Sequence, residues 1–279
     1  MRWTRGGTSE NIEDRRGVRV GRGVGVGLGG IVVLGLLSLL TGQNFLALLG
    51  PLNEMTSQTT EESGPIQSTP EEDERVQFVS FVLDDAQSTW AKLLPGRYRP
   101  AKLVLFREVV QSGCGTAQSA LGPFYCPLDE KAYIDLGFYE DLRSRFGAKG
   151  GDFAQAYVLA HELGHHVQHV LGIDEHVRRA QQQRPDMQNP LSVRMELQAD
   201  CFAGVWGHAT QQRSILEAGD LEDALNAASA IGDDRIQQRM GGGVQPESFT
   251  HGSAEQRVQW FRRGFESGKP ESCDTFAGG

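Results

Sequence analysis

The residues best suited to chemistry lie in one short stretch, HELGHH, which begins at His161. It holds His161, Glu162 and His165 in the order HExxH. On a helix the two histidines lie one turn apart on one face, so both imidazoles can bind one metal ion. Glu162 projects beside them and is placed to take a proton from a water molecule that the ion activates. The pattern predicts a zinc-dependent hydrolase; the alternative is a polar patch on an amphipathic helix.

A catalytic zinc site takes three protein ligands and leaves one position open. His169 lies about 12 Å along the helix axis from His161, too far for both to bind the same ion. His166 points about 100° away from His165 and is excluded in the same way. The third ligand must therefore come from another element.

Glu196 is the remaining candidate, within the run MELQAD of a second predicted helix. It would complete a set of two histidines and one glutamate. Asp200 lies one turn further on the same face, where it can accept a hydrogen bond from a ligand imidazole. The alternative is a solvated helix face that carries ordinary acids. The apolar residues around both acids argue against it, because unpaired carboxylates would be costly there.

The oxyanion that develops during hydrolysis needs a further hydrogen-bond donor. We predict His251, in the segment FTHGS before the last helix, as this second catalytic residue. The alternative is that His251 only neighbours the N-terminus of that helix and has no catalytic part. Tyr133 and Tyr157 are alternative donors. The predicted strand at 132–136 is expected to bind substrate as an added strand.

The first 22 residues carry six arginines and three acids, a net charge of +3, which leaves −12 for the rest of a chain whose total is −9. Residues 23–50 carry no charge and are long enough to cross a hydrocarbon core of about 30 Å. They predict a single transmembrane signal anchor, with residues 1–22 in the cytoplasm and the rest outside it. A cleaved signal peptide is the alternative. The acidic exported part argues against a nucleic-acid partner.

Residues 51–70 are rich in Ser, Thr, Glu, Gln and Pro and predict a flexible linker. The domain at 71–279 then opens with a helix, for which Thr69 is the N-cap, Pro70 the first residue and Glu72 the capping-box acid. Short strands are predicted at 101–106 and 131–138. Helices are predicted around the motif and at 138–146, 173–183, 191–216, 221–231 and 254–265, with a loop at 184–190. The layout predicts an α+β fold, mainly helical with a small β-sheet.

The four cysteines also indicate the cellular compartment. An even count on the oxidising side of a membrane favours two disulfides, which we predict between Cys114 and Cys126 and between Cys201 and Cys273. Buried free thiols are the alternative. A cysteine zinc site is disfavoured because no CxxC spacing exists.

The chain resembles the bacterial putative neutral zinc metallopeptidase family, whose members are membrane-anchored. The resemblance rests on HELGHH followed by ELQADCFAGVW, on the start MRW and NIEDRRG, and on the single hydrophobic span. More distantly, the set is similar to the gluzincin group of the zincins. The resemblance implies a zincin-like domain in the bacterial inner membrane, acting on protein or peptide substrates. It also implies zinc at His161, His165 and Glu196, with Glu162 catalytic and Asp200 supporting the ligands.

The main hypothesis is thus a membrane-anchored zinc peptidase with Glu162 as general base and its domain on the periplasmic or extracellular side. Two alternatives stay open. One is a catalytically inactive zincin fold that serves as an envelope binding or scaffold protein. The other is a zinc hydrolase that acts on a non-peptide substrate.

Overall fold

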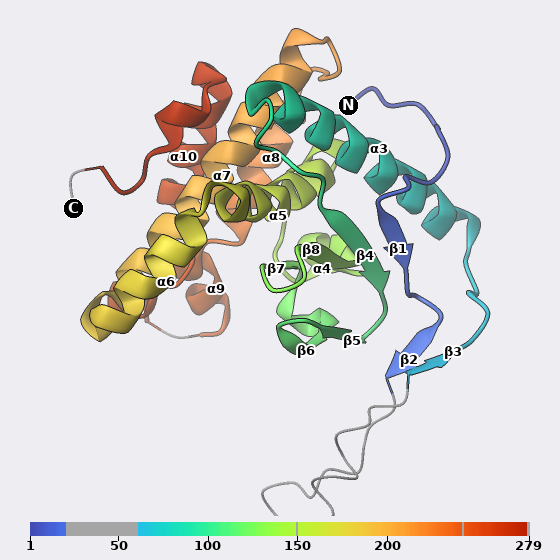
Figure 1. Ribbon diagram of the computed structural model, residues 1–279, viewed down its shortest axis with the longest axis horizontal. Helices are drawn as coiled ribbons and strands as arrows, with labels where there is room; N and C mark the ends of the chain where they lie inside the picture. The colour runs from blue at the N-terminus through green and yellow to red at the C-terminus, as the bar shows by residue number, and fades with distance from the viewer. Residues whose placement is uncertain (21–60, 149, 242, 278–279) are drawn as a thin grey trace, which may run out of the picture.

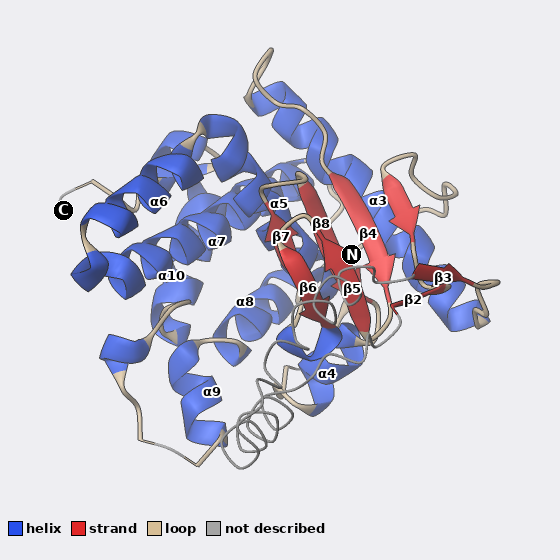
Figure 2. Ribbon diagram, turned by 60° about the horizontal axis from the view of Figure 1, so that its bottom comes forward, coloured by secondary structure: helices blue, strands red, loops and turns tan. Residues whose placement is uncertain are grey.

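The computed structural model describes residues 1–20, 61–148, 150–241 and 243–277. It is a mainly helical α+β fold, as predicted. In Figure 2 the strands lie together on one side of α5, and α6 to α10 lie on the other. The described helices are α3 Pro70–Leu93, α4 Phe138–Ser144, α5 Asp152–Leu171, α6 Ile173–Gln183, α7 Gln188–Gln212, α8 Asp220–Ala230, α9 Asp233–Arg239 and α10 Ala254–Ser267.

The main sheet has the strand order β1-β4-β8-β7. β1 and β8 are both parallel to β4, whereas β7 is antiparallel to β8. Because side chains alternate along a strand, Leu103 and Leu105 face the core formed with α3 and α5, and Val104 and Phe106 pack on the opposite face. The strands of this sheet are β1 Ile12–Asp14, β4 Lys102–Phe106, β7 Phe124–Cys126 and β8 Lys131–Asp135.

Helix α3 begins as predicted. The side chain of Thr69 accepts from the backbone of Glu72, whose side chain in turn accepts from the backbone of Thr69. Most other predicted helices also form, but α7 starts at Gln188 and so takes up part of the predicted loop. Helix α9 was not predicted at all.

The prediction that residues 1–22 form a segment apart from the domain is wrong. β1 is a strand of the main sheet, and Lys131 of β8 in the same sheet donates to Glu13 at 2.8 Å. β2 (Val18–Val20) pairs antiparallel with β3 (Glu61–Ser63), so part of the predicted linker is also a strand. Figure 1 shows both strands at the lower edge of the molecule. Strands cannot pair across a bilayer, which contradicts the placement of residues 1–22 and the domain on opposite sides of a membrane.

The predicted span at 23–50 lies outside the described residues. Among the helices that are described, none combines the length and the apolar character required to cross a bilayer.

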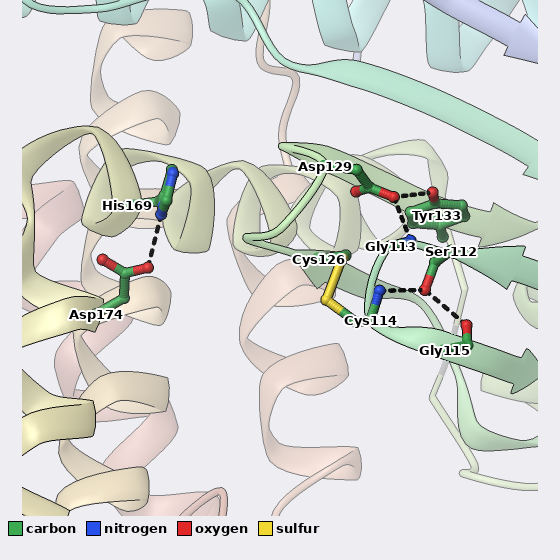
Figure 3. The surroundings of a disulfide bond; sticks show 9 residues. All are labelled: Ser112, Gly113, Cys114, Gly115, Cys126, Asp129, Tyr133, His169 and Asp174. Atoms are coloured by element: carbon green, nitrogen blue, oxygen red, sulfur yellow. Dashed lines mark hydrogen bonds and ion pairs between the residues drawn. A yellow bond between two sulfur atoms is a disulfide. The ribbon is translucent and has the colours of Figure 1, made fainter.

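Both predicted disulfides are confirmed. Cys114 is bonded to Cys126 at the end of β7, and Cys201 of α7 is bonded to Cys273 near the C-terminus. Figure 3 shows the first of these beside the hairpin of β5 (Val109–Ser112) and β6 (Gly115–Gln118), where Asp129 accepts bonds from Gly113 and Tyr133. This bond ties the turn between β5 and β6 to β7, at the edge of the main sheet.

Candidate metal centre

Helices α5 and α7 bring His161, His165 and Glu196 together. His161 Nε2 lies 3.1 Å from one carboxylate oxygen of Glu196, and His165 Nε2 lies 3.4 Å from the other. Zinc bonds of about 2.0–2.2 Å in a tetrahedral site hold neighbouring ligand atoms about 3.3 Å apart. The donor types and their spacing therefore fit one zinc ion.

Gly164, between the two ligand histidines, allows this approach of α5 to α7. A Cβ atom at this position would lie 2.8 Å from the carbonyl oxygen of Ala199 and 3.0 Å from its Cα. Both are backbone atoms of α7 that cannot rotate away. Only glycine lets the two helix backbones come this close, and that closeness places Glu196 opposite the histidines.

Asp200 lies directly behind His161. One of its carboxylate oxygens is 2.8 Å from His161 Nδ1 and accepts a bond from the Tyr157 hydroxyl at 2.5 Å. Arg257 of α10 donates from Nε and Nη2 to the two oxygens at 2.8 and 3.0 Å. Burial would raise the pKa of Asp200, but Arg257 and His161 lower it to about 2. Asp200 is therefore a permanently charged acceptor that directs His161 Nε2 toward Glu196.

Neighbouring charges shift the pKa values of the donor groups. Burial alone would lower the pKa of His161, but Asp200 and Glu196 raise it to about 10. For Glu196 burial acts in the opposite direction, and the two histidines nevertheless hold its pKa well below the usual value. Because histidine binds a metal only in its neutral form, binding of the ion is coupled to the release of a proton from His161.

Glu162 is buried and lines the same cavity as the three donors, which has a volume of ≈ 490 Å³. Burial raises the pKa of Glu162, although the two histidines oppose the shift. A raised pKa suits a carboxylate that must take up and release a proton.

The family comparison is decisive at this point. Residues 1–276 match the model of the family described as "Putative neutral zinc metallopeptidase". The chain belongs to this family. Zn²⁺ is accordingly its cofactor, and His161, His165 and Glu196 are the group able to hold it.

Two relatives of this neutral zinc metallopeptidase family member extend the comparison. The protein YpfJ of Escherichia coli (strain K12), named as uncharacterized, is 49% identical over 288 residues, with 99% of each chain covered. The protein Rv2575 of Mycobacterium tuberculosis, also named as uncharacterized, is 48% identical over 204 residues, which cover 70% of this chain and 68% of the relative. No solved structure matches.

The cavity of this metallopeptidase-family chain is lined by polar and apolar side chains. His251 and Arg257 line it together with the metal-site residues. The apolar lining comes from the segment before β7, from β7 itself, from α4 and the residues after it, and from the region of α8 and α9: Leu121, Phe124, Phe138, Phe146, Ile231 and Ile236.

His251 reaches the cavity from the loop before α10, and Asp233 of α9 holds it there. Asp233 Oδ1 lies 3.2 Å from His251 Nδ1, and Oδ2 accepts from the backbone N–H groups of Thr250, His251 and Gly252. The bond to Asp233 raises the pKa of His251. Of the alternative donors, Tyr157 lines the cavity but its hydroxyl is bonded to Asp200.

The strand beside the cavity is β7, not the predicted one. β8 contains the predicted residues and is paired on both sides, so it has no free edge. β7 is the edge strand, and its Phe124 and Tyr125 line the cavity. The expected substrate strand at 132–136 is therefore wrong.

The other histidines of the motif helix contact neighbouring segments instead of the metal centre. His166 Nε2 lies 2.7 Å from the carbonyl oxygen of Arg99, so it donates, and Nδ1 accepts from the Tyr125 hydroxyl at 2.9 Å. His169 pairs with Asp174 at 2.7 Å. His166 thereby links β7 to the helix that carries the ligands.

Proposed function

We propose that the protein is a zinc-dependent endopeptidase in which Glu162 is the general base. The observation that carries the proposal is the meeting of His161, His165 and Glu196 with the buried Glu162 in one open cavity. Family membership supports peptide-bond hydrolysis at the coarser level.

Zinc, when bound, supplies a Lewis acid that polarises the scissile carbonyl and acidifies water. Glu162 takes the proton of the attacking water and passes it to the leaving amine, for which its raised pKa is suited. His251, whose pKa the bond to Asp233 raises, donates a hydrogen bond to the oxygen on which negative charge develops. Asp200 holds the His161 ring in its ligand orientation.

The surroundings of the cavity support an extended peptide as substrate. β7 offers a free strand edge beside the metal centre, to which a peptide backbone can add as a further strand. The apolar side chains that line the cavity suit a bulky apolar side chain of the substrate. Binding of an extended chain along this edge favours cleavage within a chain over removal of single terminal residues.

The experiment that tests the proposal is Glu162→Gln in the full-length protein, measured for zinc content and for peptidase activity. The amide fills the same space but cannot accept the proton, so activity should fall by about 10²–10⁴-fold while zinc is retained. Glu175→Gln, the same change at an exposed position of α6, is the control and should leave both unchanged. A Glu162→Gln protein that keeps its zinc and its full activity would refute the mechanism.

We further propose that the folded part works in an oxidising compartment outside the cytoplasm. The two disulfides support this, because such bonds persist in secreted and periplasmic proteins and are rare in the cytosol. Attachment to the inner membrane through residues 23–50 stays a prediction, with β1 and the rest of the main sheet on the same side of the membrane.

A further inference from the structure

Gln168 of α5 is fully buried and is hydrogen-bonded at both ends of its amide. Its Oε1 lies 2.8 Å from Nδ1 of the ligand His165, one turn earlier on the same helix. Its Nε2 donates to the backbone carbonyl of Met195 at 2.7 Å and to Gln198 Oε1 at 3.1 Å. No position of the HExxH pattern specifies this residue.

These contacts decide which way the amide is turned. A backbone carbonyl can only accept, so the group that faces Met195 must be the NH₂ of Gln168. Its oxygen then faces His165 Nδ1, which must carry a hydrogen in order to donate. In a neutral imidazole this leaves the lone pair on Nε2, the atom that faces Glu196. Gln168 thus selects the tautomer of His165 that can bind a metal.

The same amide also joins the two ligand helices. Met195 immediately precedes Glu196, so the bond to its carbonyl fixes α7 relative to α5 beside the third ligand. Figure 1 shows these two helices crossing at the centre of the molecule. Gln198 continues the connection by donating to the carbonyl of Cys273, which is disulfide-bonded to α7. A row of buried amides therefore runs from His165 to the C-terminal disulfide.

We propose that Gln168 is the positioning residue for the metal ligand His165 and that, through Met195, it sets the spacing between His165 and Glu196. The proposal rests on the proposed function only in that the site binds zinc. It gives the two ligand histidines different supports: a charged carboxylate behind His161 and a neutral amide behind His165.

The test compares Gln168→Leu with wild type in the oxidised full-length protein, by competition for zinc against a chromophoric chelator. Loss of the acceptor should weaken zinc binding about 10- to 100-fold. Gln87→Leu, the same change at a buried position of α3, is the matched control and should leave zinc affinity unchanged.

Gln168→Glu separates positioning from a merely structural role. A carboxylate can accept from His165 but cannot donate to Met195, and it adds a buried charge. The Glu variant should therefore be less stable than the Leu variant and yet bind zinc more tightly. If zinc affinity simply follows stability across the two variants, or if Gln168→Leu binds zinc as wild type does, the inference is overturned. Wild-type protein that binds zinc without cleaving peptides would instead count against the proposed function.

Discussion

Gly164→Ala adds one methyl group at the closest approach of α5 and α7. The new carbon would lie 2.8 Å from the Ala199 oxygen and 3.0 Å from its Cα, whereas unstrained carbon contacts are about 3.5–4.0 Å. Because both atoms belong to the backbone, the helices must separate by about 0.5–1 Å at this point. Metal–ligand distances tolerate only about 0.2 Å. The substitution should therefore disturb zinc binding although it touches no ligand.

The size of the effect follows from the strain. Overpacking of this kind costs about 1–3 kcal/mol, which we expect as a lower free energy of unfolding of the metal-free protein. Binding of zinc requires the original helix spacing, so the free energy of zinc binding should become less favourable by a similar amount. This corresponds to a loss of affinity of about 5- to 150-fold. Chelator competition measures the affinity, and denaturant unfolding measures the stability.

Gly207→Ala is the matched control on α7. A Cβ there would meet the ring of Phe265 at 3.0 Å and that of Phe153 at 3.4 Å, and these side chains can shift. The position lies about 16 Å along the helix from Glu196. The control should lower stability without changing zinc affinity. If Gly164→Ala loses stability but binds zinc like wild type, the helix spacing does not govern the site.

Two further predictions concern the groups that support the centre. Arg257→Met leaves the buried Asp200 without the arginine that pairs with it and should lower the free energy of unfolding by about 3–5 kcal/mol. Adding Asp200→Asn should recover part of that loss, which a double-mutant cycle of denaturant unfolding measures. The bond to Asp233 raises the pKa of His251, so activity that needs the protonated ring is complete below about pH 6.5 and is lost as the pH rises through the raised pKa. Asp233→Asn should move this alkaline limb of kcat/KM to lower pH, and an unmoved limb would exclude His251 as the titrating donor.

The parts of the fold that the sequence predicts are those set by local spacing. Two histidines at i and i+4 must share a helix face, and the capping box at Thr69 needs only residues within one turn. β1 could not be found in this way, because a three-residue strand is stabilised by its partner β4, about ninety residues later. The arginines around β1 precede an apolar run, so in the sequence they suggest the flank of a membrane span. In the fold, Arg16 is buried and paired with Asp14.

Arg257 shows why part of the site also escapes sequence reasoning. On an amphipathic helix an arginine is normally an exposed residue. Here it is 2% exposed because a carboxylate on α7 requires a cation. The sequence did contain one signal, since Asp200 was predicted to lie among apolar residues, where it needs more than one partner. Which residue supplies that partner depends on how α10 packs on α7, and no local pattern encodes that.

The charges around the centre explain why the two ligand histidines have unlike supports. The charge of Asp200 is balanced by Arg257, and the charges of Glu196 and Glu162 together match those of one divalent cation. With zinc the buried centre is thus neutral, as a cavity of low dielectric requires. A carboxylate at position 168 would add a second negative charge behind the ligand histidines. The groups that contact Nε2 of Gln168 are a carbonyl oxygen and an amide oxygen, and neither is a cation that could balance this charge. A neutral amide can orient His165 without that charge, so the glutamine is explained by the charge balance of the whole site.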